Sequence, residues 1–150
     1  EIIEGYEKLL KMMRPWVLKL MKPFMKKATY EQFSSFILPL AETYVDQRKR
    51  GFDGLFYHAP AVLIFHHSPY AEVADCMIAC TYAMLAAESM GLGNTMIGGA
   101  PPIMERNPML CQKLGIPKNN TPKIALIVGY PATHFEKTIQ RHFTHVHWVE

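Results

Sequence analysis

The feature that most limits how this chain can fold is an uncharged run of twelve residues, Cys76 to Ala87, which lies between Asp75 and Glu88. A membrane-spanning helix needs about 20 apolar residues, so this run is too short to cross a bilayer. It forms the middle of a predicted helix over residues 71–90 that is apolar almost all round. Such a helix must be covered on several sides, and we expect it at the centre of the domain or at a dimer contact.

The segments around this helix predict a sheet covered by helices. Apolar residues at helical spacing predict a helix over 2–13, after which Pro15 either ends the helix or starts a new one. They predict another helix over 30–48 that is kinked at Pro39. The order of the later elements, strand–helix–strand–helix–strand, is typical of a sheet with helices packed on it. The later predicted segments are a buried strand over 61–66, strands over 95–97, 123–129 and 146–149, and a helix over 103–114 interrupted near Pro108.

Length and charge exclude several classes of protein. The chain has 150 residues, of which 49% are apolar, and this fits a single domain over residues 1–150 with a sizeable core. The net charge of +3 is too small to indicate a nucleic-acid-binding protein, whose basic surface is usually dense. We therefore expect neither a nucleic-acid partner nor a membrane partner.

The positive charge is concentrated at the start of the chain. Residues 1–27 contain seven Lys and Arg side chains but only three Glu. One interpretation is a solvated helix face. The alternative is a surface that attracts an anion or an acidic protein.

Cysteine and histidine spacing gives no support for a metal site. Cys76, Cys80 and Cys111 cannot all pair, and no CxxC or Cys/His zinc spacing exists. We interpret them as reduced, buried thiols of a cytoplasmic protein. His66 and His67 are adjacent on a predicted strand, so they point to opposite faces, and we expect no bound metal.

The glycine-rich stretch over residues 91–100 is neither a P-loop nor a dinucleotide-binding fingerprint. No Gly-Lys-Ser/Thr follows it, and a helix rather than a strand precedes it. Gly98 and Gly99 come directly after the predicted strand 95–97. Either they serve only the turn, or they allow a flat ligand to approach the backbone closely.

Two cations follow the last strong strand and the turn at Gly129 to Pro131. Lys137 and Arg141 are either solvated charges or, for the arginine especially, a clamp for a phosphate group. The sequence contains no GxSxG nucleophile motif and no paired-carboxylate pattern.

Several short motifs follow one another in a definite order along the chain: AlaProAlaValLeuIle (59–64), Asp75, LeuAlaAlaGluSerMetGlyLeuGly (85–93), IleGlyGly (97–99), LeuGlyIlePro (114–117) and ValGlyTyrPro (128–131). This ordered set resembles the nitroreductase-like flavoproteins. The ending of the chain looks like a subgroup often fused to an N-terminal ferredoxin domain, on the basis of Phe135, Lys137, Arg141, Val146 and Trp148. The resemblance is strong over residues 55–150 and weak over 1–54.

This resemblance implies an α+β fold with three layers, α/β/α, in which helices flank a central mixed sheet. It implies bound FMN, with Ile97, Gly98 and Gly99 against the flavin ring and Lys137 and Arg141 near the phosphate. It also implies a homodimer, a ferredoxin-type domain or partner, and hydride transfer from NAD(P)H or another small-molecule donor to a nitroaromatic, quinone or similar acceptor. Because the cofactor carries such chemistry, we assign no catalytic side chain.

The N-terminal third departs from the family pattern. These proteins carry an Arg/Ser/Arg motif near their N-terminus that helps to hold the phosphate, and nothing in residues 1–54 matches it. We therefore expect the chain to begin after that motif and to be the C-terminal part of a longer domain. The alternative function is a non-catalytic binding or dimerisation module that keeps the fold without a complete FMN site.

Overall fold

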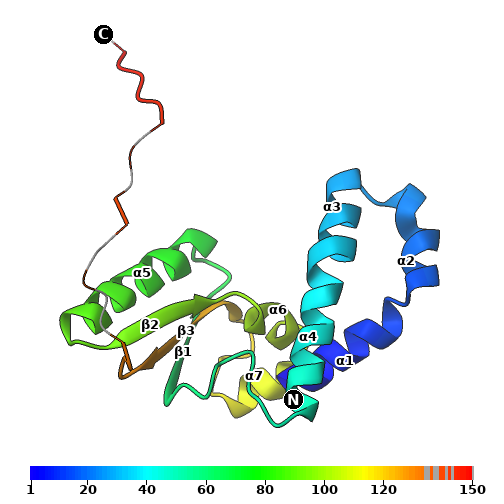
Figure 1. The fold of residues 1–150 in the computed structure, drawn as a ribbon, viewed down its shortest axis with the longest axis horizontal. Coiled ribbons are helices and arrows are strands. Elements are labelled where there is room, and N and C mark those ends of the chain that lie inside the picture. Colours follow the sequence, from blue (N-terminus) through cyan, green and yellow to red (C-terminus); the bar gives the residue numbers. More distant parts are fainter. Residues whose placement is uncertain (134–135, 137–138, 141, 143, 150) are drawn as a thin grey trace.

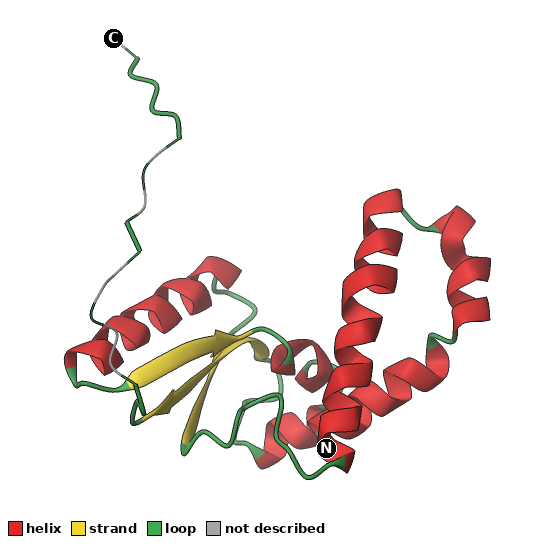
Figure 2. Cartoon of the chain, in the orientation of Figure 1, coloured by secondary structure: helices red, strands yellow, loops and turns green. Residues whose placement is uncertain are grey.

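The computed structural model describes the whole chain except residues 134, 135, 137, 138, 141, 143 and 150. A small sheet with helices on both faces forms one end of the molecule, and the N-terminal helices extend from it (Figures 1 and 2). The first third contains α1 (Ile2–Met12), α2 (Pro15–Met21), η1 (Lys22–Phe24), α3 (Lys27–Gln32), η2 (Phe33–Ile37) and α4 (Leu38–Lys49).

The two helices predicted in this third are confirmed. Pro15 starts a new helix, α2, which is one of the two expected alternatives, since its missing N–H costs nothing in a first turn. The kink predicted at Pro39 takes the form of η2, a π-helical turn that lies between α3 and α4. Proline cannot donate a hydrogen bond to the preceding turn, and a locally wider turn accommodates that loss.

The sheet has three strands, β1 (Ala61–His67), β2 (Gly93–Ile97) and β3 (Thr121–Gly129), in the order β1-β3-β2. Both pairs are antiparallel. The expectation of a mixed sheet is therefore wrong for the described part of the chain. The crossover from β1 through α5 (Val73–Ser89) leads to a strand of the same direction, but β3 lies between the two and runs opposite to both.

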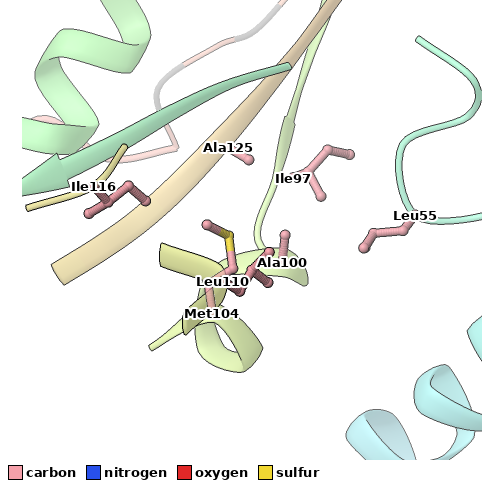
Figure 3. Packing of buried hydrophobic residues seen from close by; sticks show 7 residues of the cluster. All are labelled: Leu55, Ile97, Ala100, Met104, Leu110, Ile116 and Ala125. Carbon is pink, nitrogen blue, oxygen red and sulfur yellow. The ribbon is translucent and has the colours of Figure 1, made fainter. Parts of the chain in front are cut away.

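Side chains of β3 alternate between two apolar clusters, which confirms the three-layer arrangement. Ile124 and Leu126 pack against Cys76 and Cys80 of α5 on one face. Ala125 packs on the other face, with residues from β2, from α6 (Ala100–Met104) and from α7 (Pro108–Lys113) (Figure 3). The central strand is thus covered on both sides, as its apolar sequence predicts.

Two predicted strands differ from expectation. The segment predicted as a buried strand forms β1, but Ala61, Val62 and Leu63 are exposed, because β1 lies at the edge of the described sheet. Residues 146–149 form no strand, and Val149 is 86% exposed. An apolar run shows that the side chains of a segment must be shielded from water, but it does not show which neighbouring segment shields them.

Helix α5 lies on the sheet, as predicted, but only one of its faces is buried. Its start is fixed by a capping box between Glu72 and Asp75. Its outward face, by contrast, exposes Ile78 (55%), Tyr82 (71%) and Leu85 (63%). Among the described residues, no helix is both long enough and apolar enough to span a membrane.

Candidate functional site

The residues predicted to contact a flat ligand lie where β2 ends and α6 begins. Ile97, the last residue of β2, is buried in the cluster with Ala100, Met104 and Ala125, so its side chain belongs to the core (Figure 3). The backbone then turns through Gly98 and Gly99 into α6.

The structure gives these two glycines different reasons to lack a side chain. Neither adopts a positive φ, so the backbone conformation does not require glycine at either position. A Cβ on Gly99 would lie 3.1 Å from Tyr6 Oη and 3.3 Å from Tyr44 Oη, and would therefore crowd the interior. A Cβ on Gly98 would meet no atom within 4 Å. Gly98 thus presents bare backbone to open space.

Gly98 and Gly99 also line a cavity of about 520 Å³, which we call the Gly98 pocket. Its walls come from α1, from the helical stretch that runs from the end of α3 through η2 into α4, and from residues 98–106 around α6. Aromatic and aliphatic side chains dominate the lining, and Arg106 is its one charged residue. Besides Arg106 and the two glycines, the lining residues are Tyr6, Leu9, Gln32, Phe33, Phe36, Ile37, Leu40, Tyr44, Pro102 and Ile103.

Tyr6 fixes the position of the backbone at Gly99, which lines this pocket. Its hydroxyl donates a hydrogen bond of 2.6 Å to the carbonyl oxygen of Gly99. Its ring packs edge to face on Tyr44, with centroids 5.3 Å apart. Burial raises the pKa of Tyr6 to about 12, with a smaller contribution from Tyr44, and burial also raises the pKa of Tyr44. Both hydroxyls are therefore neutral near pH 7, and Tyr6 remains a donor.

We expect Tyr6→Phe to lower the free energy of unfolding by about 1–2 kcal/mol, because it leaves the Gly99 carbonyl without its donor.

The parent chain should also lose stability at alkaline pH. Folding raises the pKa of Tyr6 from 10.0 to about 12. The stability that the neutral Tyr6 hydroxyl contributes is therefore complete below pH 10 and is lost as the pH rises through 12. The loss should be roughly 2–3 kcal/mol. Urea unfolding across this range measures both effects, and an equal alkaline loss in Tyr6→Phe would contradict the assignment.

Sequence reasoning did not find Tyr6, Phe33, Phe36 or Tyr44. Each belongs to an apolar stripe on a predicted helix, and such stripes are more often core than binding site. Lys137 and Arg141 lie outside the described residues, so their place at a phosphate remains a prediction.

The cysteines are free thiols in the structure. Cys76 and Cys80 are buried on α5, and burial raises the pKa of each thiol. A raised pKa keeps a thiol protonated and unreactive at neutral pH. Among the described residues, no group of three or more His, Cys, Asp or Glu side chains is placed to hold a metal ion.

Comparison with known proteins identifies the family. The model of the nitroreductase family matches residues 7–130, which is most of the chain, and this chain therefore belongs to the nitroreductase family. No curated protein matches the sequence.

Two similar solved structures are nitroreductases with bound FMN. The one from Bacteroides fragilis NCTC 9343 is 25% identical, with a TM-score of 0.56 over 70% of this chain and 60% of that one. The one from Desulfitobacterium hafniense DCB-2 is 26% identical, with a TM-score of 0.55 over 71% of this chain and 61% of that one. The chain thus spans about three-fifths of the length of these relatives, and it shares their fold over that part.

Proposed function

We propose that this chain belongs to an FMN-dependent oxidoreductase and that the Gly98 pocket receives the flavin ring. The observation that carries the proposal is the bare backbone of Gly98 at the wall of a largely apolar cavity, in a chain whose relatives contain FMN. A flavin ring is flat and mostly apolar, and small-molecule sites are typically apolar clefts with a few placed polar groups. The residues present therefore fit the ring.

Each residue of the site has a distinct task in this proposal. Gly98 allows the ring to approach because it carries no Cβ, and in this proposal its N–H donates to a ring nitrogen. Tyr6 positions that segment through the Gly99 carbonyl, and Ile97 anchors it to the core. The aromatic side chains of the pocket exclude water. FMN, when bound, supplies the chemistry by accepting a hydride from NAD(P)H or another donor and reducing a nitroaromatic, quinone or similar acceptor.

The same proposal extends to assembly and location. The outward apolar face of α5, formed by Ile78, Tyr82 and Leu85, is a suitable contact for a second copy in a homodimer. Three free cysteines, of which Cys76 and Cys80 are buried and Cys111 is half-buried, agree with a cytoplasmic protein. A ferredoxin-type domain or partner remains part of the proposal as an electron donor.

The phosphate assignment has its own test. If Arg141 clamps the phosphate, Arg141→Ala should weaken FMN binding roughly ten- to a hundredfold, because a charge-assisted pair contributes about 1.5–3 kcal/mol. Riboflavin lacks the phosphate and should bind the variant and the parent alike. Titration of both ligands by fluorescence measures the difference. Unchanged FMN affinity, or an equal loss for riboflavin, would remove Arg141 from the site.

A further inference from the structure

The N-terminal helices carry a concentrated positive surface that the flavin site does not use. Residues 8–27, which we call the basic arm, run from the last turns of α1 through α2 and η1 to the start of α3. They contain Arg14 and six lysines (Lys8, Lys11, Lys19, Lys22, Lys26 and Lys27) but no Asp or Glu. Every one of these cations is exposed. Figure 1 shows α2 at the end of the molecule opposite α5.

The charge of the arm is largely uncompensated. In the described part of the chain, Lys27 is the one arm cation within 4 Å of a carboxylate, at 3.9 Å from Glu31. Lys22 instead lies over the ring of Tyr30, 5.3 Å from its centroid. Seven exposed cations within twenty residues produce a strong positive potential, which attracts a negatively charged partner.

The arm also exposes large apolar side chains among the lysines. Trp16 is 65% exposed, Leu20 is 66% exposed and Phe24 is 88% exposed. Trp16 and Leu20 are four residues apart on α2 and therefore share a face, and η1 continues directly from α2 to Phe24. The arm thus combines a tryptophan, a leucine and a phenylalanine with flanking lysines on short helices.

We infer that the basic arm binds the surface of a membrane rich in anionic lipid. Helices that lie in a membrane interface combine Lys and Arg with Trp, Phe and Leu in this way. The composition separates this partner from an acidic protein, because protein interfaces are enriched in Arg and depleted of Lys, and six of the seven cations here are lysines. The chain has no membrane-spanning run, from which we expected no membrane partner, but binding at the surface requires none.

The test is co-sedimentation of the full chain with vesicles made of equal parts phosphatidylcholine and phosphatidylglycerol, compared with pure phosphatidylcholine. We expect binding to the anionic vesicles alone and its loss when salt is raised from about 0.1 M to about 1 M. Lys11→Gln, Lys19→Gln and Lys26→Gln together should lower the partition coefficient roughly a hundredfold, since each lysine near such a surface contributes about 1 kcal/mol. The matched control removes the same charge elsewhere, at Arg48, Lys49 and Lys118, and should bind like the parent.

The apolar contribution is tested separately. Trp16→Ser with Phe24→Ser should lower the partition at least roughly tenfold, whereas Tyr70→Ser with Met109→Ser, at residues also highly exposed, should have no effect. Melting temperatures confirm that each variant is folded.

Three results would overturn the inference. The first is equal partition of the lysine variant and its control. The second is stronger binding to poly-glutamate than to vesicles, which would indicate an acidic protein. The third is self-association abolished by the Trp16/Phe24 variant, which would assign the arm to a second copy.

Discussion

Gly98→Trp is expected to abolish FMN binding while leaving the fold intact. A side chain at this position enters open space, since a Cβ there meets nothing within 4 Å. The indole would then occupy the volume that the flavin ring needs. We expect affinity to fall at least about a hundredfold, or ~2.7 kcal/mol, with little change in the melting temperature of the FMN-free chain.

Gly99→Ala is the matched control for this variant. Its Cβ would press on Tyr6, Leu55 and Tyr44 at 3.1–3.3 Å, so it should destabilise the fold by about 1–3 kcal/mol through overpacking. The two glycines should therefore separate, with Gly98 affecting the ligand and Gly99 affecting stability. Equal effects of both substitutions on FMN affinity and on stability would show that the open side of Gly98 is not the ring site.

Tyr82→Glu should convert the proposed homodimer to monomers. Tyr82 is 71% exposed on the outward face of α5, so the charge is harmless in a single chain but would be buried twice in a symmetric contact. Burial of unpaired charges costs several kcal/mol, and the dissociation constant should rise at least roughly a thousandfold. Sedimentation velocity across a range of concentrations measures the change.

Two further variants control this experiment. Tyr70→Glu places the same charge at another exposed tyrosine, outside α5, and should leave the dimer intact. Met84→Glu places it on the side of α5 that packs against the cluster containing Ile124 and Leu126 of β3, and should destabilise the monomer itself. A Tyr82→Glu chain that dimerises like the parent would exclude this face of α5 from the contact.

The elements that the sequence predicts well are those whose pattern is local. The uncharged run of α5, the strand at 123–129 and the break near Pro108 all follow from periodicity and from proline chemistry. The direction and order of the strands cannot be predicted from such local patterns, because they depend on which distant segments pair. The insertion of β3 between β1 and β2 is set by long-range packing on α5 and α6.

The candidate site also contains residues that the sequence could indicate and residues that it could not. Gly98 and Gly99 could be singled out because two glycines directly after a strand are locally unusual. Tyr6 could not be singled out, because its hydrogen bond to the Gly99 carbonyl joins residues 93 positions apart. Likewise, the sequence gives Trp16, Leu20 and Phe24 no feature that distinguishes exposed apolar residues from core ones, and their exposure is visible only in the folded chain.

The visible spectrum of the purified chain, before and after titration with FMN, tests directly whether this chain binds a flavin. We expect a yellow complex with flavin absorbance at about 450 nm and on the order of one FMN per chain, because the cofactor carries the chemistry of this family. Gly98→Trp should remain colourless under the same conditions. A folded parent chain that takes up no FMN would contradict the account and would favour the alternative of a non-catalytic binding or dimerisation module.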